Sequence, residues 1–424
     1  MSGTLDRYFR PGVIASAYIG LIPLAWPALP ANLHVADLLF PLLAVATFRR
    51  HRCTWQLRPL DCCVIAYLLF LLPSLLVTDD VGASSLELCK RLYLAAVYVV
   101  FALHFRSEGY LVAFKAIVFG AGVVCAFGLA VTAVYFLAHA SVPEIGAPSP
   151  IPYVGTVLRL GLLTEAPAML ANYLTFALPF LVTARFAGLL GRRAWMGSLG
   201  GAAAVVILSF SHALAGFVTA GLATVWPLAR GGRGHALRAA GVIATIVLIL
   251  LFNAMLLVTV RRVDWRADFD DSVPRSAAAY EFQRDEGARR LNLQVSYNPM
   301  SYYLLKAVAW RAFLERPWTG VGLDRFHALT AQAADEGRIH EPYRIADPHS
   351  TLFGALAETG IFGTLAIPIL LIVALVPRRR SDGSPAGWFV FASQAAIIGL
   401  AVNSLNADIM NFRFLWVGLA ALRS

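Results

Sequence analysis

The residue whose type and position point most directly to chemistry is a histidine, in the sequence Asp347-Pro348-His349-Ser350. Aspartate is a favoured N-cap and proline a favoured first-turn residue, so we expect Asp347 to begin a helix with His349 in its first turn. The exposed N–H groups and the dipole at a helix N-terminus disfavour imidazolium and attract anions. This pattern predicts a neutral His349 that can accept a proton, and it is equally typical of a histidine that only caps a helix.

Cations that could bind an anionic substrate precede other apolar segments. Arg159 lies two residues before Gly161, and Glu165 lies two residues before Pro167 and an apolar run. An arginine at this place can bind a diphosphate through two parallel hydrogen bonds, or it can extend to lipid headgroups. Residues 261–348 hold further cations, of which we expect one or two to touch substrate: Arg261, Arg262, Arg289, Arg290, Lys306 and Arg311.

Two more groups of charges lie beside apolar runs. Asp408 and Arg413 occupy a short connection near the C-terminus, close to Asn403. Charges at such depth line a polar cavity or pair with each other, and the pattern favours a pair between Asp408 and Arg413. Lys90 and Arg91 begin another apolar run, where at least one of them is expected to extend to lipid headgroups.

Paired carboxylates support a different chemistry. Asp79-Asp80 and the acidic run 268–271 could hold a divalent metal or act as a base, although such pairs are common in polar loops. The remaining histidines and the five cysteines show no metal-ligand spacing or disulfide framework. The sequence also has no phosphate-binding P-loop, dinucleotide fingerprint or G-x-S-x-G segment. We therefore expect neither a metal nor a cofactor.

The composition identifies the elements that must position these residues. Of 424 residues, 58% are hydrophobic and 14% are charged, and the mean hydropathy is +0.67. An ordinary soluble domain has about a quarter charged residues, so a soluble fold is excluded. Residues 239–260 are apolar on every face, which argues against the alternating strands of a membrane barrel. We predict an all-α, polytopic integral membrane protein.

Reading the apolar runs in order predicts about twelve transmembrane helices with soft boundaries. They divide the chain into helices 1 to 9 over 1–260, a large loop over 261–348 and helices 10 to 12 over 349–424. The expected spans are 12–30, 35–48, 61–77, 88–105, 110–138, 168–190, 195–211, 213–229, 239–260, 349–376, 386–405 and 411–422. Residues 349–376 would measure about 42 Å as one helix, so we expect a break at Glu358-Thr359-Gly360.

The net charge of +10 comes largely from short basic clusters beside the apolar runs, a pattern of membrane orientation rather than nucleic-acid binding. These clusters fall at alternate connections, so we place both termini in the cytoplasm. The connections 78–87, 139–167, 261–348 and 406–410 are then outside. The basic clusters are Arg7 and Arg10, Arg49 to Arg52, Arg106, Arg192 and Arg193, 230–238, Arg378 to Arg380, and Arg423.

The large outer loop is predicted to fold against the membrane. It carries charges of both signs and several aromatic residues. Asn298-Pro299 is typical of a helix start, and apolar residues recur at helical spacing until Pro317, which indicates an interfacial helix. The apolar residues are Leu305, Val308, Ala309, Ala312 and Phe313.

Three segments together resemble the superfamily of O-antigen ligases and polymerases, which are bacterial envelope glycosyltransferases. They are Arg159-x-Gly161 with Glu165-x-Pro167, the Pro-x-x-Gly-x-Gly segment within 316–326, and His349 with Glu358-x-Gly360-x-x-Gly363. Each segment is loose alone, but their order and outer placement are specific in combination. The twelve-span layout with one large outer loop is also similar.

The resemblance implies an inner-membrane enzyme that moves a glycan from undecaprenyl diphosphate to an acceptor hydroxyl on the periplasmic side. The acceptor is lipid A core for a ligase and a second lipid-linked glycan for a polymerase. Transfer in the family inverts the anomeric carbon without a metal. His349 would then be the base, with Arg159 and a loop cation on the diphosphate. Further residues expected at the substrate are Arg91, Glu165, His212, Arg289, Lys306, Asp408 and Arg413.

The sequence departs from the family at two positions. Many relatives have Ser-Arg where this chain has Ser211-His212, and many have an arginine before the Pro-x-x-Gly-x-Gly segment where this chain has Tyr302, Tyr303 and then Lys306. The second cation on the diphosphate is therefore open. Lys306 is preferred over Arg289 and Arg290 because it lies on the expected interfacial helix.

Ligase is slightly preferred over polymerase because of the regular layout and the large last loop. A secondary transporter or flippase would also place charges within the membrane, but its repeated halves are not seen in the sequence. A polyprenyl-phosphate-sugar transferase using Asp79-Asp80 as base is a third alternative, and its activity would be lost on metal chelation.

Overall fold

The computed structural model describes most of the chain. The described residues are 11–24, 34–50, 55–106, 109–138, 146–151, 155–161, 164, 166–209, 211–228, 257–262, 293–298, 301–339, 343–376 and 384–423. All structural statements below refer to these residues.

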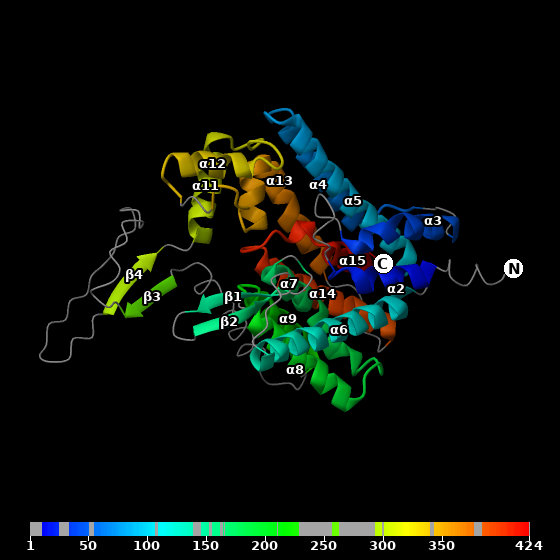
Figure 1. Ribbon diagram of the computed structural model, residues 1–424. Helices are drawn as coiled ribbons and strands as arrows, with labels where there is room; N and C mark the ends of the chain where they lie inside the picture. Colours follow the sequence, from blue (N-terminus) through cyan, green and yellow to red (C-terminus); the bar gives the residue numbers. More distant parts are fainter. Residues whose placement is uncertain are drawn as a thin grey trace, which may run out of the picture.

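Helices dominate the described chain, with two short two-stranded ribbons beside them (Figure 1). The α-helices are α2 (Pro11–Leu21), α3 (Phe40–Arg50), α4 (Pro59–Leu75), α5 (Val81–Phe105), α6 (Gly109–Ala138), α7 (Pro167–Ala184), α8 (Arg192–Leu208), α9 (Leu214–Leu228), α11 (Ser301–Glu315), α12 (Phe326–Asp335), α13 (Thr351–Leu375), α14 (Pro385–Asn403) and α15 (Arg413–Leu422). Two 3-10 helices are η2 (Val35–Leu39) and η4 (Ile409–Asn411).

Four of these helices are long and apolar enough to cross a membrane: α6 over Gly109–Tyr135, α7, α13 and α14. Helices α2, α4 and α15, with Leu214–Val225 of α9, are apolar but shorter. Each span expected from the sequence, apart from 239–260, overlaps one described helix. The helical membrane fold is therefore supported, and the number of twelve crossings stays a prediction.

The ninth expected span differs from the structure where the two can be compared. Residues 239–256 lie outside the described chain, but 257–260 belong to strand β3 (Leu257–Arg262). This strand pairs antiparallel with β4 (Leu293–Asn298), with Val258 opposite Tyr297. The expected helix end is wrong here because Val258, Thr259 and Val260 are β-branched and have a partner strand for their backbone groups.

A second ribbon lies within the connection 139–167, which the apolar pattern leaves as a loop. Strands β1 (Gly146–Ile151) and β2 (Gly155–Leu160) pair antiparallel, with Ala147 opposite Arg159. Leu160 at the end of β2 is buried in the main core. The ribbon therefore reaches the helices at the point where α7 begins.

Helix α7 is the centre of the bundle. Its residues from Leu170 to Ala184 are all buried, and it packs against α8, α9 and α14 (Figure 1). The sequence of α7 is apolar on all sides, which suits a helix that is surrounded by other helices or by lipid, and here helices surround it. The side chain of Asn403 joins three of these helices because its amide donates to Asn172 Oδ1 at 2.8 Å and accepts from the Gly216 backbone N at 2.9 Å.

Helix α13 is broken at the position expected from its length. Gly360 has φ 65° and ψ −159°, which is not helical and lies in the region that favours glycine. The backbone groups around this break are paired by the segment that follows α11. Ile361 N donates to Pro317 O at 2.8 Å, and Val321 N donates to Ala357 O at 2.9 Å. We call this pairing of 317–322 with 357–361 the backbone clasp.

The described part of helix α11 begins at Ser301, and Asn298, the expected N-cap, ends strand β4. Pro299 lies outside the described residues. The buried face of the helix is the expected one, and it packs on α12 and α13 in a small core of its own (Figure 1). That face consists of Leu305, Val308, Ala309 and Ala312. The helix is thus part of a folded layer that covers the start of α13.

Candidate functional site

His349 lies directly before helix α13 and not in its first turn. The helix begins at Thr351, and its N-cap is Ser350, whose Oγ accepts from Phe353 N at 3.4 Å. The predicted N-cap, Asp347, is therefore wrong by three residues. The start is fixed by the connection before α15, because Thr351 N donates to Ser404 O at 2.9 Å and Thr351 Oγ1 donates to Ala407 O at 2.8 Å.

The backbone at His349 is unusual. Its φ is 44°, in the left-handed region that non-glycine residues seldom adopt. Such conformations cost about 1–2 kcal/mol, and they persist where the surrounding structure holds them. The side chain is half-buried beside the helix N-terminus. The local fold therefore holds this histidine in place at a measurable cost in stability.

Lys306, the preferred loop cation, lies close enough to His349 for its charge to act on the imidazole. Lys306 Nζ donates to Asn406 Oδ1 at 2.6 Å, which joins α11 to the turn after α14. Burial lowers the pKa of the Lys306 ammonium. Burial also lowers the pKa of His349, the Asp347 carboxylate opposes this, and the Lys306 charge lowers the pKa further. The imidazole is consequently neutral at pH 7 and can accept a proton.

A second histidine stands beside this group. His327 on α12 lies with its Nε2 3.4 Å from Asp347 Oδ1. Asp347 itself is exposed and lies two residues before His349 in the chain. Sequence reasoning did not single out His327, because no spacing connects it with residue 349. Only the packing of α11 and α12 on α13 brings it there.

Arg91 and Asp408 form an ion pair with each other, whereas Asp408 was expected to pair with Arg413. Arg91 Nη2 lies 2.7 Å from Glu87 Oε1 and 3.2 Å from Asp408 Oδ2. The expected pair of Asp408 with Arg413 is wrong, because Arg413 Nε donates to Asp37 Oδ1 at 2.7 Å. Helix η4 separates Asp408 from Arg413 and directs the two side chains to different neighbours.

The backbone clasp connects these groups with the family-like Gly-rich segments. A Cβ on Gly320 would lie 2.3 Å from the carbonyl carbon of Glu358, and a Cβ on Gly360 would lie 2.5 Å from that of Trp318. Glu358 Oε1 also accepts from Phe326 N at 3.3 Å, at the start of α12. Two segments 40 residues apart in the sequence thus form one support for the start of α13.

The acidic pair of the competing hypothesis is bound to a cation. Arg325 Nε lies 2.6 Å from Asp79 Oδ1, and Arg325 Nη1 lies 3.5 Å from Asp80 Oδ2. The hydrogen bond from Arg325 holds the pKa of Asp79 below its usual range. No group of three metal-ligating side chains occurs in the described part of the chain. The run 268–271 lies outside it.

The other expected site residues are described only in part. Arg159 has a described backbone in β2, but its side chain is outside the description, as are Glu165, Arg289 and Arg290 altogether. His212 lies in the turn between α8 and α9, half-buried. Their roles stay predictions.

Comparison with models of protein families gives a match over part of the chain. Residues 192–367 match the model of a family described as O-antigen ligase. The match includes α8, α9, α11, α12 and most of α13, and hence Lys306, the backbone clasp and His349. No curated protein matches the chain. Members of this family are membrane-embedded, glycosyltransferase-like enzymes that act on lipid-linked glycans. The match supports the resemblance drawn from the sequence motifs: residues 192–367 are similar to the O-antigen ligase family.

Proposed function

We propose that this protein transfers a glycan from undecaprenyl diphosphate to an acceptor hydroxyl, with His349 as the base. The single observation that carries the proposal is His349 itself. It is a half-buried imidazole with a lowered pKa, held in a strained backbone at the start of α13, inside the segment that matches the family. The proposed reaction inverts the anomeric carbon and needs no metal. Lipid A core is the preferred acceptor.

In the proposed step the acceptor oxygen attacks the anomeric carbon while its proton passes to a ring nitrogen of His349. The bond between the anomeric carbon and the diphosphate oxygen breaks, and undecaprenyl diphosphate leaves with the electron pair. Diphosphate is already a good leaving group, so stabilising its charge matters more than protonating it. The proton on His349 is returned to solvent.

The cations near the site differ in how readily they can bind the diphosphate. Lys306 is half-buried, and its hydrogen-bond partner is a neutral amide. An incoming diphosphate would therefore not have to displace this amide from a charged pair before it binds the ammonium. Arg159 is proposed as the second diphosphate ligand from the sequence motif. Arg91 and Arg413 already bind carboxylates, so with Asp408 we propose that they shape the walls of the substrate site. Glu165, His212 and Arg289 are proposed at its margin.

We place the reaction at the periplasmic face of the inner membrane, with both termini in the cytoplasm. Four contacts support this grouping of the outer and inner connections. The expected outer connection 78–87 meets the large loop through Arg325, and 406–410 meets it through Lys306 and Asn406. At the expected inner end, the Arg106 and Arg423 guanidinium groups both lie over the ring of Trp55.

The proposal is tested by transfer in proteoliposomes, with undecaprenyl-diphosphate glycan as donor and EDTA present. Lipid A core and a second lipid-linked glycan are offered separately. We expect product from the wild type and at least about a hundredfold less from His349→Gly. Glycine suits the left-handed backbone at this position, so the variant should fold. Product with the second glycan alone would identify a polymerase. Undiminished transfer by the variant would remove the proposed base, and lipid transport without product would identify a flippase.

A further inference from the structure

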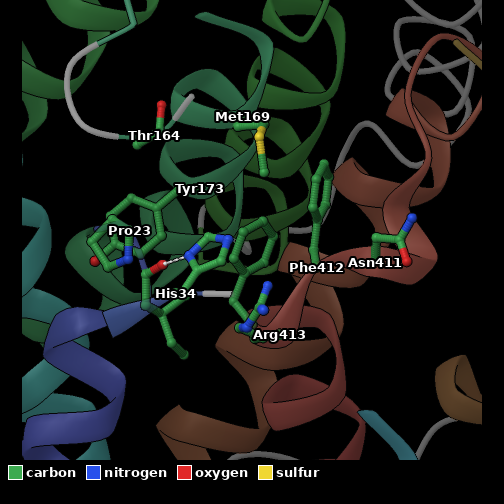
Figure 2. Close-up of a pocket in the computed structure, with 10 residues that line it drawn as sticks. Pro23, His34, Thr164, Met169, Tyr173, Asn411, Phe412 and Arg413 are labelled. Atoms are coloured by element: carbon green, nitrogen blue, oxygen red, sulfur yellow. Dashed lines mark hydrogen bonds between the residues drawn. The ribbon is translucent and has the colours of Figure 1, made fainter. Parts of the chain in front are cut away.

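The pocket beside Arg413 is small (Figure 2). Residues from three connections line it, among them His34, Thr164 and Phe412. The space inside it admits about one water molecule, so it cannot hold a substrate group. A side chain with a further role in the proposed reaction is found instead in the layer over α13.

Helix α12 carries the chain segment that precedes the proposed base. Thr330 Oγ1 on α12 donates to Arg344 O at 2.9 Å, and the guanidinium of Arg344 forms an ion pair with Asp335 at the end of the helix. Asp347 Oδ1 lies 3.4 Å from Nε2 of His327, in the first turn of the helix. The segment therefore lies along α12, and the position of this helix determines where the chain reaches the base.

The start of α12 depends on a side chain of α13. The N-cap residue is Arg325, whose guanidinium has no oxygen to accept from the first N–H groups of the helix. Phe326, the first helical residue, is buried. Glu358 Oε1 on α13 accepts from Phe326 N at 3.3 Å. Glu358 thus caps α12 from another helix.

The backbone clasp holds Glu358 at this place. Glu358 O accepts from Gly322 N at 3.1 Å, within the segment that leads to α12. The same segment is tied to α5 on its other side, because Ser84 Oγ donates to Leu323 O at 2.6 Å. The side-chain cap and the backbone clasp therefore act together on the turn before α12.

We propose that Glu358 is a positioning residue for the transfer reaction: its carboxylate caps α12, and α12 places the segment that ends at His349. The inference rests on the proposed function. Glu358 acts through α12 and not on the substrate. The cap needs a hydrogen-bond acceptor at this distance rather than a negative charge, because an amide oxygen can accept the same hydrogen bond.

Three substitutions at Glu358 separate the acceptor from the charge. Glu358→Gln keeps an oxygen that can accept from Phe326 N but removes the charge. Glu358→Asp keeps the charge but is shorter, so its oxygens withdraw from Phe326 N, and Glu358→Met has neither. Glu315→Met is the matched control, since Glu315 is exposed and its ion pair stays within α11. Thr330→Val removes the bond to the 344–347 segment and leaves the cap in place.

The first measurement does not depend on catalysis. Hydrogen exchange of the full-length protein in nanodiscs reports the backbone amides of α12 and of residues 343–350. We expect Glu358→Met and Glu358→Asp to accelerate exchange in both segments about tenfold, and Glu358→Gln about twofold or less. Exchange in the buried helix α7 should stay unchanged. Thr330→Val should accelerate exchange in 343–350 but not at the start of α12.

The second measurement is glycan transfer in proteoliposomes. Glu358→Met should lower kcat about tenfold and leave the KM for the donor within about twofold, because the base is displaced while Lys306 on α11 is not. Glu358→Gln should recover most of kcat, and Glu315→Met should match the wild type.

Four outcomes would overturn the proposal. They are unchanged exchange of 343–350 in Glu358→Met, exchange in Glu358→Gln as fast as in Glu358→Met, faster exchange without a lower kcat, and faster exchange in α7 as well, which would mean a general loss of stability. If the wild type transfers no glycan, the proposed function fails, whereas the exchange result still decides whether Glu358 holds the segment through α12.

Discussion

The two charged clusters at opposite ends of the bundle differ in how completely their charges are compensated. At the expected inner end, the buried Asp61 carboxylate accepts from Arg423 Nε at 2.7 Å, from Tyr98 Oη at 2.7 Å and from Arg58 N at 2.8 Å. Arg423 also lies 3.9 Å from the centre of the Trp55 ring. The Asp61 carboxylate and the Arg423 guanidinium are therefore compensated by groups of the protein itself.

At the other end, Lys306 and His349 are two basic groups close together. Lys306 donates to a neutral amide, and within the described chain it forms no ion pair with a carboxylate. Burying a cation without a counter-charge is unfavourable. A binding site explains such a cation, because an anionic ligand supplies the negative charge when it binds. The comparison favours a structural role for the Asp61–Arg423 pair, and it supports the proposed binding role of Lys306.

The largest effect on stability is expected from breaking the compensated pair. Arg423→Met leaves Asp61 buried without its counter-charge and should lower the free energy of unfolding by about 3–5 kcal/mol. Lys306→Met removes a partly desolvated charge with one neutral partner, so its effect should stay below about 1 kcal/mol. Thermal unfolding of both purified variants in detergent checks the difference. A larger loss from Lys306→Met would reverse the two roles.

The next largest effect is expected at the backbone clasp. Gly360→Ala forces a Cβ to within 2.5 Å of Trp318 backbone atoms at a residue with φ 65°, and should cost at least about 2 kcal/mol. Transfer should fall as well, because the clasp supports the helix that begins beside His349. Gly122→Ala in α6 is the matched control, since no atom lies within 4 Å of its added Cβ. Equal unfolding free energies and equal transfer rates of the two variants would show that the clasp does not support the helix.

A smaller effect is expected on the pH dependence of transfer. His349 must be neutral to act as a base, so kcat/KM should rise with pH and level off above a pKa below 6.5. Lys306→Met removes a charge that lowers this pKa, and its profile should move to higher pH. Asp347→Asn removes a charge that raises it, and its profile should move to lower pH. Each displacement should be about one pH unit or less.

Both displacements in the same direction, or a profile that neither substitution moves, would exclude His349 as the titrating group. The height of the plateau is a separate quantity, since Lys306 is also proposed to bind the diphosphate. Only the position of the rising limb tests the electrostatic coupling.

The helices, the break in α13 and the buried face of α11 could be predicted from the sequence because each depends on local pattern. Apolar runs of membrane length occur where helices lie. The run at α13 is longer than one crossing, so a break was expected, and it occurs at Gly360. Leu305 and Ala309 recur at helical spacing and are buried together. Lys306 was preferred among the loop cations because it lies on the expected interfacial helix, and its proximity to His349 was not predicted.

The predictions were wrong where contacts with segments that are distant in the sequence determine the structure. Asp347 and Ser350 are both acceptable caps, and the bonds of Thr351 to the turn at 404–407 selected Ser350. Asp408 and Arg413 are near in sequence, but Arg91 and Asp37 compete for them from other helices.

The central claim is that the imidazole of His349 accepts the proton of the acceptor hydroxyl, and chemical rescue tests it most directly. His349→Gly leaves space where the side chain was and relieves the left-handed backbone. Added imidazole should restore transfer in proportion to its concentration, with a pH dependence that follows the pKa of imidazole instead of that of His349. Wild-type transfer by His349→Gly without imidazole would contradict the account.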